Sequence, residues 1–126
     1  MSATILVIDS DAAVVSAYKR TLERHGYEIL GASSAKEGLQ ILTKERPEAV
    51  IQDVRVPGPL SASFLMRVKA LYPSLPVIAV TAFSTTFTEA DAKRAGANGY
   101  FVKPFDVHSL IEKLQDMAVS CKGRGR

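Results

Sequence analysis

Hydrophobic residues occur along this chain in two alternating patterns. In the first pattern, they form short continuous runs that are typical of strands. In the second, between these runs, they recur every three or four positions, which is typical of helices with one buried face. Five strands alternating with five helices predict a doubly wound α/β domain with a parallel sheet and right-handed crossovers. The five strand-like runs are Ile5–Ile8, Tyr27–Leu30, Ala49–Ile51, Val77–Val80 and Tyr100–Val102.

Residues that start or stop helices lie at the ends of the periodic segments. In the first segment, Tyr18 and Leu22 share a face, and Gly26 follows in the position of a C-terminal cap. The second segment can begin at Ser33 or Ser34, since both can act as N-caps. The helical spacing and its end signals therefore agree.

The third and fourth periodic segments differ in how much apolar surface they can bury. The third has a stripe that predicts a buried face, formed by Phe64, Leu65, Val68 and Leu71. The fourth, about Thr88 to Ala95, has mostly alanines as inward anchors and buries little apolar area per turn. It is either a helix that shifts at small cost or a short surface helix with no moving part.

The composition is that of an ordinary soluble globular protein. A length of 126 residues suits one domain, with 47% hydrophobic and 23% charged residues. No apolar stretch approaches the roughly 18 residues needed to span a bilayer. The N-terminus lacks the pattern of a signal peptide, and a single cysteine, Cys121, excludes an internal disulfide framework. We therefore expect a cytoplasmic protein.

Charge is concentrated at the C-terminus. The chain has 16 basic and 13 acidic residues, and three of the basic ones, Lys122, Arg124 and Arg126, lie in the last five positions. The rest of the chain is therefore balanced, so its charge does not favour nucleic acid. We expect a folded domain over residues 1–119 and a basic flexible tail or linker stub over 120–126.

Charged or hydroxyl residues follow four of the five predicted strands. They are Asp9, Asp53, Thr81 and Lys103. Because the carboxyl ends of parallel strands meet at one edge of a sheet, where ligands bind in such folds, we expect these side chains to gather. A carboxylate can attack a phosphorus centre, a divalent cation bridged by a second acid offsets charge, and lysine and hydroxyl hold phosphoryl oxygens.

Four motifs occur in the order and with the spacing of a known family, namely ILVID, VIQDVRVPG, LPVIAVTA and AGANGYFVKPF. With them, the chain resembles the receiver domain of two-component response regulators, including the chemotaxis receiver, from about residue 4 to 117. The resemblance implies a flavodoxin-like (βα)5 fold with strand order 2-1-3-4-5. It also implies a signalling module that catalyses only its own phosphorylation and dephosphorylation.

The same resemblance implies partners. A sensor histidine kinase or a phosphotransfer protein would donate the phosphoryl group, and a downstream protein or a covalently linked output domain would respond to it. We expect no membrane partner, and nucleic acid only if an output domain outside this sequence binds it.

The resemblance also implies roles for individual residues. Asp53 would be the phosphoacceptor, assisted by Thr81 and Lys103, whose peptide bond to Pro104 would be cis. Thr81 and Tyr100 would form the switch. Taken alone, Thr81 would also suit a strand, Lys103 would suit a solvated surface, and Tyr100 would suit ordinary packing. The four matching strand ends taken together favour the functional roles.

The implied cofactor is Mg²⁺, held by Asp9, Asp53 and the backbone carbonyl of Arg55. The sequence departs from the family at Ser10, where a second acid usually ligates the metal. Asp11 either caps the first helix, which we favour, or bends inward to replace that acid. Since Mg²⁺ prefers charged oxygen ligands, we expect Ser10 to weaken its binding.

Three alternatives remain at this point. The chain could be a degenerate receiver that binds partners without phosphorylation, although it retains Asp53, Thr81 and Lys103. It could be a small doubly wound enzyme or flavin carrier, but the acidic stretch DSDAAV replaces the phosphate-cradling loop such proteins need. Finally, Phe83 and Phe87 either form a partner surface or fold under onto the sheet.

Overall fold

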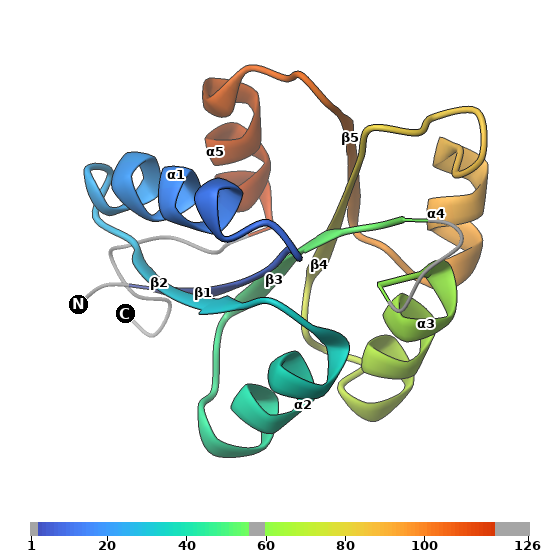
Figure 1. The fold of residues 1–126 in the computed structure, drawn as a ribbon, viewed down its shortest axis with the longest axis horizontal. Coiled ribbons are helices and arrows are strands. Elements are labelled where there is room, and N and C mark those ends of the chain that lie inside the picture. The colour runs from blue at the N-terminus through green and yellow to red at the C-terminus, as the bar shows by residue number, and fades with distance from the viewer. Residues whose placement is uncertain (1–2, 56–59, 118–126) are drawn as a thin grey trace.

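The computed structural model describes residues 3–55 and 60–117, and the findings below concern those residues. Strands and helices alternate along the chain (Figure 1). The strands are β1 (Thr4–Ile8), β2 (Glu28–Ala32), β3 (Ala49–Asp53), β4 (Val77–Thr81) and β5 (Gly99–Val102). The helices are α1 (Ala12–Glu23), α2 (Ala35–Lys44), α3 (Ala62–Leu71), α4 (Glu89–Ala95) and α5 (Val107–Asp116). None of these helices is long and apolar enough to cross a membrane.

The strands form one parallel sheet in the order β2-β1-β3-β4-β5. The predicted fold class and strand order are therefore confirmed. In the register of the sheet, Ile8 pairs with Gln52, Asp53 with Val80, and Thr81 with Val102. The last residues of β1, β3, β4 and β5 consequently lie along the same edge.

Helices cover both faces of the sheet. Helices α1 and α5 lie on one face, and α2, α3 and α4 lie on the other (Figure 1). Successive residues of β1 point to opposite faces, as in any strand. Ile5 packs in the cluster that includes Leu22 and Leu110, whereas Leu6 packs with Phe64 on the other side. All five are buried, so the sheet is covered on both sides by apolar packing.

The predicted helix caps are present. The Ala13 N–H donates to the side chain of Asp11, the predicted cap of α1. At the start of α5, the His108 N–H donates in the same way to Asp106. At α2 the cap is Ser34 rather than Ser33. Gly26, just after α1, adopts a φ of +91°, which favours glycine.

One predicted core residue lies at the surface. Leu71 was expected on the buried stripe of α3 but is 55% exposed. It is the last residue of the helix, and Tyr72 packs against the core cluster of Val68 in its place. Helix α4 buries only Ala92 and Ala95, as its alanine pattern predicted.

Candidate functional site

Three of the residues predicted at the strand ends lie in direct contact. The ammonium group of Lys103, just after β5, is 3.0 Å from Asp53 Oδ1 and 3.3 Å from Asp9 Oδ2. The two carboxylates are almost completely covered, with 1% of the Asp9 side chain and 3% of the Asp53 side chain exposed. One lysine thus bridges two acids from two different strands at one edge of the sheet.

The turn after β5 aligns Lys103 with its neighbours. The Lys103 N–H donates to the carbonyl of Thr81 over 2.8 Å, which extends the β4–β5 pairing to the rim of the sheet. The peptide bond between Lys103 and Pro104 is cis, as the resemblance implied.

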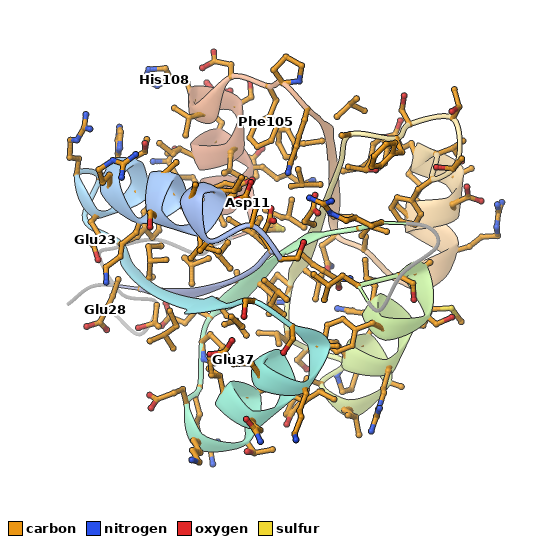
Figure 2. The ribbon with its side chains drawn as sticks, viewed as in Figure 1. Asp11, Glu23, Glu28, Glu37, Phe105 and His108 are labelled. Atoms are coloured by element: carbon orange, nitrogen blue, oxygen red, sulfur yellow. The ribbon has the colours of Figure 1, made fainter. Side chains whose placement is uncertain are left out.

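Asp11 lies at the start of α1 (Figure 2). Its carboxylate accepts the N–H of Ala13 over 2.9 Å, so it acts as the helix cap. Its own N–H donates to Asp9 Oδ1 over 2.9 Å, which orients that carboxylate. Ser10 is exposed. Asp11 therefore caps α1, in agreement with the favoured interpretation.

Arg55 contributes a contact that the sequence analysis missed. Its Nε lies 2.7 Å from Asp53 Oδ2, and its side chain remains 44% exposed. The hydrogen bond to Asp53, together with that residue's negative charge, raises the pKa of Arg55. The spacing of two residues between Asp53 and Arg55 was the signal that could have indicated this contact, because alternate residues of an extended segment point to the same side.

Thr81 is fully buried at the end of β4. Its hydroxyl oxygen accepts the N–H of Phe83 over 2.9 Å, so it stabilises the turn that leaves the strand. The hydrogen bond of the Thr81 hydroxyl therefore lies in the turn and not with the group in which Lys103 contacts Asp9 and Asp53.

Tyr100 is joined to the segment that precedes α4. Its hydroxyl donates to the carbonyl of Phe87 over 2.7 Å, and the two rings lie 6.0 Å apart between centroids. Partial burial raises the pKa of Tyr100. Phe87 is 2% exposed whereas Phe83 is 50% exposed, so the two phenylalanines divide between core and surface.

The acidic groups offer oxygen ligands of the kind that Mg²⁺ prefers. Asp9 and Asp53 meet at Lys103, while Asp11 is engaged as a helix cap. Over residues 3–55 and 60–117, no three His, Cys, Asp or Glu side chains gather as metal ligands. With two carboxylates, Asp9 and Asp53, these residues fit a divalent cation in chemical type.

Residues 5–115 match the family described as the response regulator receiver domain. The chain belongs to this family. Receiver domains are signalling modules of two-component systems rather than enzymes in the usual sense. This membership replaces the alternative of a small enzyme or flavin carrier.

The chain is similar to proteins of different sizes. It is 35% identical over 112 residues to the response regulator protein FleR of Pseudomonas aeruginosa, covering 89% of this chain but only 24% of FleR. It is 30% identical to sporulation initiation phosphotransferase F of Bacillus subtilis, covering 91% of this chain and 93% of that protein. A solved relative, the response regulator protein TrrA of Thermotoga maritima in complex with Mg²⁺–BeF, has a TM-score of 0.81 and 27% identity, covering 91% and 98% of the two chains.

Proposed function

We propose that this receiver domain accepts a phosphoryl group on Asp53 from a sensor histidine kinase or a phosphotransfer protein. The observation that carries the proposal is the contact of the Asp53 carboxylate with Lys103, which also holds Asp9. A carboxylate held beside a fixed ammonium group at a sheet edge suits an acceptor of an anionic group. We further propose that phosphorylation changes the surface offered to a downstream protein or a linked output domain.

The transfer needs no external catalyst in this scheme. An oxygen of Asp53 forms a bond to phosphorus, and the bond from phosphorus to the donor histidine nitrogen breaks, with its electron pair returning to the imidazole. Lys103 lies on Asp53 Oδ1 and is placed to stabilise the oxygens of the arriving group. Hydrolysis by water reverses the modification and releases inorganic phosphate.

Receiver domains generally bind Mg²⁺. In this chain we assign Asp9, Asp53 and the backbone carbonyl of Arg55 to such an ion. When bound, the ion offsets the negative charge of the acids and of the phosphoryl oxygens. Asp9 is held ready for this role by the Asp11 N–H, which fixes its Oδ1.

A chain of hydrogen bonds supports the proposed switch between Thr81 and Tyr100. The Phe83 N–H donates to the Thr81 hydroxyl, and the Phe83 carbonyl accepts the N–H of Phe87 over 3.0 Å. The Phe87 carbonyl then accepts the hydroxyl of Tyr100. If the Thr81 hydroxyl turns to a phosphoryl oxygen, it releases the Phe83 N–H, and the disturbance reaches Tyr100 through this segment. Helix α4 follows the segment directly and buries only two alanines, so it can adjust at small cost.

The proposal is tested by intact-mass analysis after incubation with acetyl phosphate, with and without Mg²⁺. We expect the unmodified protein to gain one phosphoryl group and Asp53→Asn to gain none. Asp11→Asn keeps a capping side chain outside the acid pair and is the matched control, which should still be modified. If the unmodified protein gains no phosphoryl group, the degenerate receiver is the better description.

A further inference from the structure

Every carboxylate oxygen of the acid pair already has a partner within the chain. Asp9 Oδ1 accepts the Asp11 N–H, and Asp9 Oδ2 lies against Lys103. Asp53 Oδ1 lies against the same ammonium group, and Asp53 Oδ2 lies 2.7 Å from Arg55 Nε. A divalent cation that binds Asp53 therefore approaches an oxygen on which one of these two cations already lies.

Two cations already offset the charges of the acid pair. The two carboxylates, Asp9 and Asp53, face Lys103 and Arg55. Ser10 adds no charge, whereas Asp11, the cap of α1, adds a negative charge that also acts on Arg55. An incoming divalent cation consequently meets carboxylates whose charges are already paired with cations of the chain.

The two cations are not equally easy to displace. Within residues 3–55 and 60–117, Lys103 pairs with both acids and is 25% exposed, whereas the Arg55 side chain pairs with Asp53 alone and is 44% exposed. The Arg55 guanidinium can swing into water while keeping its charge solvated, because its stem already reaches the surface. Because its positive charge is fixed and its hydrogen bond to Asp53 Oδ2 is short and charge-assisted, Arg55 holds this oxygen strongly as long as the contact lasts.

We propose that Arg55 is an internal competitor of the divalent cation in this receiver. Its guanidinium occupies Asp53 Oδ2, and the metal binds only as that contact opens. The affinity for Mg²⁺ is then set by the displacement of this side chain as well as by the number of acids. The inference rests on the proposed function only in placing the cation at Asp53.

The competition is tested by titrating Mg²⁺ into the unmodified protein and its variants and following backbone amide shifts by NMR. Arg55→Met removes the competing charge and should tighten Mg²⁺ binding about tenfold, a size consistent with one repelling charge at a partly exposed site. Arg55→Lys keeps a positive charge and should tighten binding less than Arg55→Met. Arg94→Met removes another arginine paired with an aspartate, Asp91, on α4, and should leave the affinity unchanged.

A second readout uses the unmodified protein. The Arg55 Nε–H resonance should shift during the Mg²⁺ titration with the same midpoint as the amides near Asp53, because one ligand displaces the other. Equal or weaker Mg²⁺ binding by Arg55→Met would overturn the proposal. So would an Arg55 resonance that stays fixed while the amides saturate.

These results are separate from the test of phosphorylation. If acetyl phosphate fails to modify Asp53 but Arg55→Met still tightens Mg²⁺ binding, the proposed function falls and the competition stands. If phosphorylation occurs and the two Mg²⁺ affinities are equal, the competition falls and the proposed function stands.

Discussion

The ammonium group of Lys103 lies 3.0 Å from Asp53 Oδ1. The two residues lie at the ends of β5 and β3, which are separated in the sheet by β4. The same group reaches Asp9 over 3.3 Å. Lys103 is therefore the common counterion of two nearly inaccessible carboxylates. Stability and the proposed chemistry both depend on this one side chain.

Replacing Lys103 should destabilise the fold as well as prevent efficient phosphorylation. Lys103→Met removes the cation that Asp9 and Asp53 share and leaves Asp53 paired with Arg55. We expect the free energy of unfolding in urea to fall by about 2 kcal/mol, less than for a fully buried pair because Lys103 is partly exposed. Adding Asp9→Asn should recover part of the loss, and Lys36→Met, at an exposed position on α2, should lose almost nothing. A double variant no more stable than Lys103→Met would contradict this account.

Tyr100→Phe should impair the proposed switch without preventing phosphorylation of Asp53. The substitution removes only the hydroxyl that donates to the Phe87 carbonyl, so unfolding should become easier by about 1 kcal/mol. Acetyl phosphate should still modify the variant, since Tyr100 does not contact the acid pair. The amide shifts induced by phosphorylation should reach Phe83 but be reduced in α4 and β5. Shift changes identical to those of the unmodified protein would show that this hydroxyl carries no part of the signal.

The start of α4 should weaken in acid. The Thr88 N–H donates to the Asp91 carboxylate, and this hydrogen bond is the main reason that the pKa of Asp91 lies below its usual value. A lowered pKa means that the folded state favours the charged form, so the stabilisation is complete above the ordinary aspartate pKa and is lost as pH falls through the lowered value. In Asp91→Asn this contribution should disappear from urea unfolding curves measured between neutral pH and about pH 3. An unchanged pH dependence in that variant would assign the effect to other groups.

Ser10→Asp tests the departure from the family at the acid pair. A third carboxylate beside Asp9 should tighten Mg²⁺ binding, because hard cations prefer charged oxygens. Ser10→Ala removes the hydroxyl without adding charge and should leave the affinity almost the same. The comparison is made by the same Mg²⁺ titration followed by NMR. No tightening in Ser10→Asp would refute the idea that this serine weakens the site.

The fold followed from the sequence because two periodicities alternate clearly. The apolar runs that became β1, β3 and β4 are continuous, and residues such as Asp11 and Ser34 mark helix starts. The exception was Leu71, where the last turn of α3 lies at the surface and Tyr72 packs inward instead. Spacing alone does not show which of two adjacent residues the end of a helix will bury.

The residues of the candidate site were predictable where the backbone topology alone brings them together. Asp9, Asp53 and Lys103 meet because parallel strands end at one edge. The Arg55 contact was not predicted. The spacing of two places Arg55 on the same side as Asp53, but only the packed structure shows that its long side chain turns back to that carboxylate. The separation of Phe87 from Phe83 likewise depended on the course of the segment between β4 and α4.

The most direct measurement is the position of the phosphoryl group itself. After incubation with acetyl phosphate and Mg²⁺, borohydride reduction converts an aspartyl phosphate to homoserine, and peptide mass spectrometry locates it. We predict homoserine at residue 53 and its absence from protein treated without acetyl phosphate. Homoserine at residue 9 or 11, with residue 53 unmodified, would contradict the assignment.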